Sequence, residues 1–221
     1  MSERTRIIAL ALPAIFVVAL LAWMRLQPER PAPVRGGAAP LVGRGDAPRV
    51  LGRVAPFTLT DQASEPYGTA DLKGKLWIAS FIFTRCPSTC PIQTFNMLRL
   101  QSLLKVDPLW QEVRLVSVSV DPEHDTPQVL AAYARQHRAE ETHWRFLTGT
   151  REAIWKISKD SFKLAVADNV PDARMPIVHS SRFVLVDRQG MIRGYYDGME
   201  QQTLDEIIRD ARVLATESDS P

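Results

Sequence analysis

The sequence predicts an α/β fold, with a mostly parallel central sheet that ends in an antiparallel hairpin and is preceded by one N-terminal transmembrane helix. Three observations predict it. Apolar runs of strand-forming residues at 76–83 and 113–120 alternate with segments of helical length. Near the C-terminus, two further strand-forming runs flank the turn at 188–190. At the N-terminus, residues 7–24 carry no charge.

The N-terminal apolar segment follows a short tail, residues 1–6. Its eighteen uncharged residues are near the lower limit for spanning a bilayer, and are too many for the apolar part of an ordinary signal peptide. No small-x-small cleavage site follows Ala22. We therefore expect residues 7–24 to form an uncleaved single-pass anchor, with a cleaved signal as the alternative.

Residues 25–50 form the predicted linker. They are rich in Pro, Arg, Gly and Ala and lack periodicity, so they cannot bury enough surface to order themselves. Of the chain's 27 basic and 25 acidic residues, residues 1–50 hold seven and three, which leaves twenty and twenty-two for the rest. That balance, without an aromatic-studded basic stripe, argues against nucleic-acid binding. We expect one domain over residues 51–214, followed by a tail at 215–221.

Each element of the domain has its own signal in the sequence. Residues 54–60 and the polar turn after them predict an opening strand or hairpin, and runs rich in β-forming apolar residues predict buried strands. Pro91 fits the first turn of a helix that carries Ile92, Phe95, Leu98 and later leucines on one side. Thr126 followed by proline predicts a capped helix start. The expected strands are 54–60, 76–83, 113–120, 144–147, 183–187 and 191–196, and the expected helices are 91–106, 126–137, 151–161 and 203–214.

The chain holds only two cysteines, Cys86 and Cys90, each followed by proline, directly after the first buried strand. A strand-to-helix junction favours thiolates, because the positive end of the helix dipole lies there. The spacing is expected to place both sulfurs on one face, about one helical turn apart. That arrangement suits a disulfide or a soft metal ion, and the metal would need a third ligand from elsewhere. A structural disulfide is a further alternative.

The domain resembles the Sco/SenC family in three motifs: FTRCPSTCP at 83–91, VSVDPEHDTP at 118–127, and His179 ahead of FVLVDRQG at 183–190. Members of this family are membrane-anchored, thioredoxin-like copper proteins that help to assemble the Cu(A) centre of cytochrome c oxidase. The resemblance covers essentially all of residues 51–214. One departure is His124, where the family often has Arg.

The resemblance implies that Cys86, Cys90 and His179 bind one copper ion. It also implies that Asp121 lies near the cysteines, where it could orient His179 or another group around the metal, or accept a proton when the thiols ligate or oxidise. Two thiolates and an imidazole suit Cu(I) and can also hold Cu(II). The implied partners are the copper-site subunit of cytochrome c oxidase, a copper donor protein and a thiol reductant, and the N-terminal helix would bind the membrane. The implied location is a bacterial inner membrane, with the domain in the periplasm.

An enzyme is the alternative to a metallochaperone. A thiol:disulfide oxidoreductase could use Cys86 and Cys90 to reduce the cysteines of the oxidase subunit, but it would not need His179. A peroxidase-like relative would want one activated cysteine near Thr84 and Arg85. We also expect residues 167–177, which lack periodicity, to form a long loop that moves His179 toward the dithiol when metal arrives.

Overall fold

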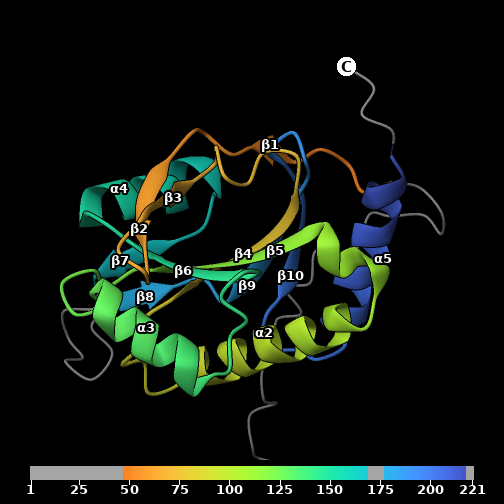
Figure 1. Cartoon of the computed structure of the whole chain (residues 1–221). Coiled ribbons are helices and arrows are strands. Elements are labelled where there is room, and N and C mark those ends of the chain that lie inside the picture. The colour runs from red at the N-terminus through yellow and green to blue at the C-terminus, as the bar shows by residue number, and fades with distance from the viewer. Residues whose placement is uncertain (1–46, 169–176, 218–221) are drawn as a thin grey trace, which may run out of the picture. The chain divides into compact units, whose positions relative to one another are not determined.

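The structure is a computed structural model that describes residues 47–168 and 177–217. Within these ranges an eight-stranded sheet has the strand order β1-β10-β9-β4-β5-β6-β2-β3, as Figure 1 shows. Its strands are β1 (Gly52–Arg53), β2 (Thr58–Asp61), β3 (Pro66–Gly68), β4 (Leu76–Ile82), β5 (Val113–Ser119), β6 (Trp144–Thr148), β9 (Arg182–Val186) and β10 (Met191–Asp197). The expected α/β fold is confirmed.

Parallel pairing holds the centre of the sheet together. Strand β4 pairs in parallel with β5, and β5 with β6, while every residue of β4 is buried. In the described part of the chain, the remaining joins of this sheet are antiparallel. The sheet is therefore mixed rather than mostly parallel. The reason is the connections, because helices return the chain between β4, β5 and β6, whereas tight turns join β2 to β3 and β9 to β10.

Two helices cover one face of the sheet. Helix α2 (Thr89–Lys105) and helix α3 (Pro127–Gln136) lie side by side below it in Figure 1, and the Thr94 and Tyr133 hydroxyls join them at 2.8 Å. As expected, the side chain of Thr126 caps α3 by accepting from the amide of Val129. The other described helical segments are the 3-10 turn at Pro108–Gln111, α4 (Arg151–Lys156), which continues as a π-helical turn at Ile157–Ser161, and α5 (Thr203–Thr216).

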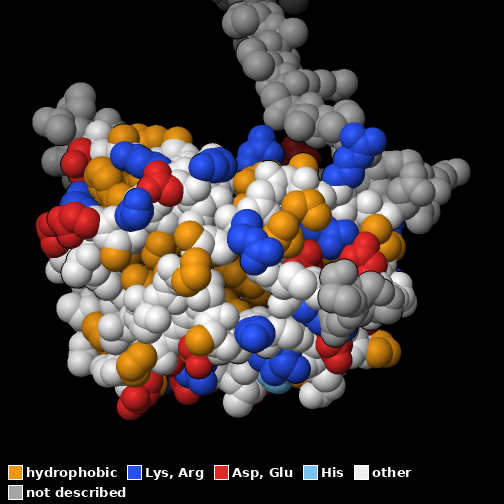
Figure 2. All heavy atoms as spheres, turned by 90° about the horizontal axis from the view of Figure 1, so that it is seen from above, with side chains coloured by type: hydrophobic (Ala, Val, Ile, Leu, Met, Phe, Trp, Pro, Cys, Tyr) orange, Lys and Arg blue, Asp and Glu red, His pale blue; other side chains and the backbone are white. Residues whose placement is uncertain are grey.

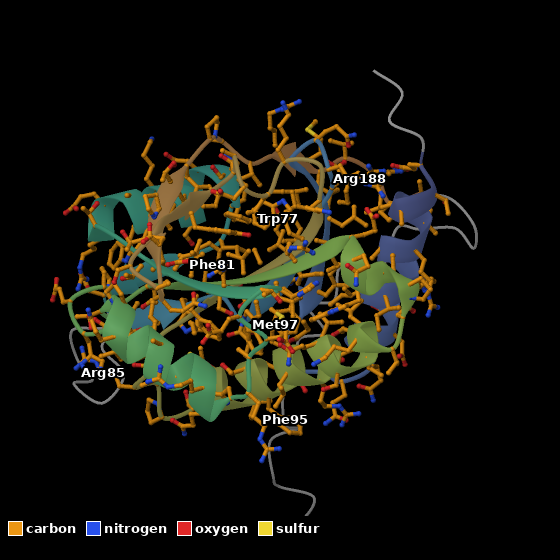
Figure 3. All side chains as sticks on the ribbon, viewed as in Figure 1. Trp77, Phe81, Arg85, Phe95, Met97 and Arg188 are labelled. Atoms are coloured by element: carbon orange, nitrogen blue, oxygen red, sulfur yellow. The ribbon has the colours of Figure 1, made fainter. Side chains whose placement is uncertain are left out.

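The inward face of α2 differs from the face that its leucines predicted. Figure 3 shows Met97 between the helix and the sheet, and Phe95 on the outer side. Met97, Leu100 and Leu104 are buried, whereas Ile92 and Phe95 stand about half exposed, at 47% and 50%. The expected apolar side is thus split, and part of it faces outward.

The upper face of the sheet packs through aromatic rings. Trp77 and Phe81 project from the same side of β4 (Figure 3), and both meet Phe162 edge to face, at centroid distances of 5.9 and 5.3 Å. Since each ring is almost fully buried, this cluster fixes the strand that leads into the cysteines.

The segment expected to be a long loop is partly ordered as strands. Residues 166–168 form β7 (Val166–Asp168), which pairs antiparallel with β8 (Ile177–His179) in a separate small sheet. Within 167–177, the loop prediction was therefore wrong for 167–168 and for Ile177. Residues 169–176 lie outside the described residues.

The expected tail at 1–6, the anchor at 7–24 and most of the linker, residues 25–46, also lie outside the described residues, as do residues 218–221. Among the helices at 47–168 and 177–217, none is long and apolar enough to cross a bilayer.

Candidate metal centre

Three soft donor side chains meet at one end of the central sheet. The Cys86 and Cys90 sulfurs and a ring nitrogen of His179 all lie within 4.8 Å of one another. Both cysteines are free thiols and both are buried, while His179 is partly exposed. The structure thus brings together two residues from the start of α2 and one that lies 89 positions away in the chain.

The two cysteines come close to each other because the chain turns between them, and not because both lie on one helix. Helix α2 begins at Thr89, so Cys86 lies ahead of it and Cys90 lies in its first turn, followed by Pro91. The Cys86 amide donates to the carbonyl of Phe83 at 3.2 Å, which folds the chain back directly after β4. The expectation that both thiols occupy one face of a helix was therefore wrong, although the junction itself and the place of Pro91 are confirmed.

Strand β8 supplies the histidine. His179 pairs with Val166 of β7, and its Nε2 atom lies 3.2 Å from the sulfur of Cys90. Its Nδ1 atom is 3.0 Å from the carbonyl oxygen of Ser180, and because a carbonyl can only accept, Nδ1 carries the proton. Nε2 faces the thiols: with a proton it can donate to a thiolate, and without that proton its lone pair can bind a metal. Phe83 packs edge to face on the ring at 5.5 Å and holds it in place.

The two thiols differ in acidity. Burial by itself raises the pKa of Cys86, but a hydrogen bond with His179 and the amides at the start of α2 outweigh it, so the pKa falls to about 5. Burial raises the pKa of Cys90 far above its ordinary value, opposed in part by a backbone hydrogen bond at Phe83. The charge on Cys86 raises it further. In the metal-free protein, Cys86 is therefore the thiolate at neutral pH and Cys90 is the thiol.

Asp121 contacts a neighbour of the cysteines. Its buried carboxylate accepts from Nε of Arg85 at 2.7 Å, in an ion pair whose arginine is half exposed. The His179 ring contacts the two cysteines and the Ser180 carbonyl instead. Asp121 thus lies near the dithiol, as the resemblance implied, and positions the residue before Cys86 rather than the imidazole.

A second buried carboxylate organises the same loop. Asp125 accepts from the Thr84 amide at 3.0 Å, from the Thr84 hydroxyl at 2.5 Å and from the Ser119 hydroxyl at 2.5 Å. It is fully buried and ties the segment before Cys86 to the end of β5. The sequence did not mark Asp125 for this role, and the cap of the following helix is Thr126. The signal available was its place in the same short motif as Asp121.

A peroxidase-like relative would need Thr84 and Arg85 beside an activated cysteine, but both side chains bond to carboxylates instead. The Thr84 hydroxyl donates to Asp125, and Nε of Arg85 donates to Asp121. Neither side chain has a contact with a sulfur among the hydrogen bonds of the described residues. The arrangement gives no support to the peroxidase-like alternative.

One pocket of the described structure lies away from these three donors. Its volume is about 620 Å³, and Figure 2 shows apolar and basic side chains together on the face where it opens. Its lining is mostly apolar, with three cations at the rim: Val54, Pro56, Leu72, Trp77, Arg53, Lys73 and Arg188 contribute. None of the three soft donors lines it, so the candidate metal centre is a separate, compact site.

The donor set is chemically suited to a soft ion. Thiolate and imidazole ligands favour Cu(I) and zinc over hard cations, and metal–sulfur bonds of about 2.3 Å allow atoms about 4 Å apart to share one ion. The three atoms lie within 4.8 Å of one another, so a contraction of about 1 Å or less brings them to that spacing. No other group of three or more metal-binding side chains is present in the described part of the chain.

Comparison with known proteins agrees with the motifs. The family profile SCO1/SenC matches residues 48–215. A SCO1 protein homolog of Bacillus subtilis (strain 168) is 37% identical over 164 residues, which cover 74% of this chain and 83% of that protein.

Two solved structures show the same fold. The structure described as a disulfide switch in BsSco, a member of the Sco family of cytochrome c oxidase assembly proteins, has a TM-score of 0.69 and 34% identity, over 78% of this chain and 100% of that one. Bradyrhizobium japonicum ScoI with copper bound has a TM-score of 0.60 and 26% identity, over 71% of this chain and 98% of that one. With its thioredoxin-like sheet and its cysteine and histidine motifs in place, this chain belongs to the SCO1/SenC family.

Proposed function

We propose that the chain is a membrane-anchored copper metallochaperone that binds one copper ion through Cys86, Cys90 and His179 and assists assembly of the Cu(A) centre of cytochrome c oxidase. The observation that carries the proposal is the convergence of three soft donors within 4.8 Å. Support comes from the ScoI relative that was solved with copper bound and from the BsSco relative, which belongs to a family of oxidase assembly proteins.

Copper is the cargo of this site. Cys86 is already a thiolate at neutral pH, so it can make the first bond to an arriving Cu(I) ion. Cys90 releases its proton as it joins, because a bound cation stabilises the thiolate. His179 completes the set through Nε2, and its Nδ1–H bond to Ser180 fixes the tautomer that this requires. Three ligands leave open positions, through which a partner's thiolates can take the ion by exchange.

The place of action is part of the proposal. We assign residues 7–24 to the anchor and the domain to the periplasmic side of a bacterial inner membrane, since the uncharged segment is long enough to span a bilayer. The copper donor, the copper-site subunit of the oxidase and a thiol reductant are the partners this requires. The reductant is needed because only the reduced dithiol binds the ion.

The acidity difference between the cysteines favours a second candidate, a thiol:disulfide oxidoreductase. The Cys86 thiolate would attack a partner disulfide and form a mixed disulfide, releasing one partner thiolate. Cys90, once deprotonated, would attack the Cys86 sulfur and release the second partner thiol, so the partner is reduced and Cys86–Cys90 is oxidised. A thiol reductant would then restore the pair.

A copper titration separates the two functions. The reduced full chain in detergent is titrated with Cu(I), in parallel with the double variant C86S/C90S and with His179→Ala. The metallochaperone binds one equivalent, loses it in the double variant, and binds at least tenfold more weakly without the imidazole, which is about 1.4 kcal/mol. If His179→Ala binds copper as tightly as the wild type, and the dithiol exchanges rapidly with protein disulfides, the reductase is established instead.

A further inference from the structure

Large apolar side chains are exposed along the helix that carries Cys90 and beside His179. The described part of the chain has seven such residues, and five of them lie on α2, directly after it, or beside His179: Ile92, Phe95, Leu103, Val106 and Val178. Figure 3 shows Phe95 directed away from the sheet. Single exposed apolar residues are ordinary, but a run along one helix marks a contact surface.

The fold does not need these side chains. The inward face of α2 is filled by Met97, Leu100 and Leu104, and by buried polar residues that bond to neighbouring segments. A helix that covers a sheet normally turns a polar face to water. Ile92 and Phe95, one turn apart on the outer face, reverse that rule and contribute nothing to the core.

Ile92 and Phe95 lie close to the dithiol along the chain. Ile92 and Phe95 occupy the first two turns of α2, within about 10 Å along the helix from its start, and Cys90 lies in the same first turn. Pro87 and Pro91, on either side of Cys90, are exposed as well. Cys86 is 6% exposed, so a protein whose ligand reaches its sulfur must lie close against the chain around it, which includes the exposed Pro87.

The charge around the pair indicates the chemistry of the partner. The segments 86–106 and 126–139, which contain α2 and α3, hold no acidic residue. Three arginines on these segments are exposed, namely Arg99, Arg135 and Arg138. A partner surface that matches this face has an apolar centre bordered by acidic side chains.

We propose that Pro87, Pro91, Ile92 and Phe95 form the docking surface for the protein that exchanges copper with this site, and that this protein presents an apolar patch with acidic residues at its rim. The inference rests on the proposed function. A protein is favoured over a membrane because ligand exchange needs donor atoms brought to Cys86, and lipid offers no such ligand. A second copy of this chain is disfavoured, because its exposed arginines would face those of the first copy and repel them.

The test measures copper transfer from the loaded full chain, in detergent, to the reduced, metal-free copper-site domain of the same organism's cytochrome c oxidase. The double variant I92S/F95S is compared with V50S/L51S, which removes two exposed apolar side chains next to β1, on the opposite side of the sheet in Figure 1. We expect I92S/F95S to transfer at least tenfold more slowly while V50S/L51S matches the wild type. Arg99→Glu should slow transfer too, most strongly at low salt.

Copper affinity and urea unfolding of each variant show whether the site and the fold survive. Transfer by I92S/F95S within twofold of the wild type overturns the docking surface and leaves the metallochaperone intact. A wild type that binds copper but never transfers it refutes the proposed function itself. Unchanged transfer, combined with Phe95-dependent binding to vesicles of phosphatidylcholine and phosphatidylglycerol or Phe95-dependent dimerisation, overturns the inference in favour of a membrane or a second copy.

Discussion

The most demanding prediction concerns the buried carboxylate of Asp125. Replacing Asp125 by Ala leaves three donors without this acceptor: the buried Ser119 hydroxyl and the partly buried amide and hydroxyl of Thr84. Each unsatisfied donor costs about 1–3 kcal/mol, for a total of about 3–9 kcal/mol. Removing the carboxylate also relieves its desolvation, which is several kcal/mol for a buried ion. Taking the middle of that range, about 6 kcal/mol, and about 3 kcal/mol for the relieved desolvation, we expect a net loss of about 3 kcal/mol of unfolding free energy.

Urea unfolding of residues 47–221 measures this loss, because a single domain of this size unfolds close to two-state and its free energy extrapolates linearly. A domain stability of about 5–15 kcal/mol leaves the variant folded enough to measure. Ser119→Ala is the partial comparison, since it removes one donor to Asp125, at a cost of about 1.5–3 kcal/mol, together with the oxygen that accepts from the Asp121 amide at 3.1 Å. A loss below about 1 kcal/mol for Asp125→Ala would show that the hydrogen bonds do not hold the loop before Cys86.

Three further predictions follow from the site and the core. Alkylation of the reduced protein should modify Cys86 selectively, and its rate should fall as the pH drops through about 5, because the thiolate is lost there; a midpoint near 9 would contradict the lowered pKa. Tyr196→Phe should cost about 1.5–3 kcal/mol in urea, since the buried hydroxyl donates to Asp210 at 2.7 Å, and an unchanged midpoint would refute that bond's contribution. Cu(I) at a thousandfold excess over its Kd should stabilise the reduced domain by about 4.1 kcal/mol, with a chelator reversing the gain; a melting temperature indifferent to copper would count against a folded-state site.

The sequence predicted the secondary structure well where the residue types themselves restrict the backbone conformation. The runs at 76–83 and 113–120 hold little besides β-forming apolar residues, and they form β4 and β5 to within one residue. Thr126 and the proline after it do cap and open α3. Pro91 does lie in the first turn of α2. Each of these features depends on neighbours in the chain, which the sequence displays directly.

Features that depend on distant partners were predicted less well. The inward face of α2 is shared with polar residues whose partners lie on other segments, such as Asn96 with the Gly198 carbonyl, so apolar spacing alone misplaced Ile92 and Phe95. The β7–β8 pair has almost no periodicity to detect, because each strand is three residues long. The preference of Asp121 for Arg85 over His179 is likewise a matter of which side chains the folded chain brings together.

The sequence by itself determined the α/β class, the strand-to-helix junction that carries the dithiol, and, through three motifs, the SCO1/SenC family and its candidate ligands. Only the tertiary structure decided that β8 carries His179 to within 3.2 Å of Cys90, that Cys86 alone is acidic, and that Asp125 fixes the loop before it. The reason is physical: periodicity and caps act over a few residues, whereas convergence of donors and the acidity of a thiol are set by atoms that meet only when the sheet closes.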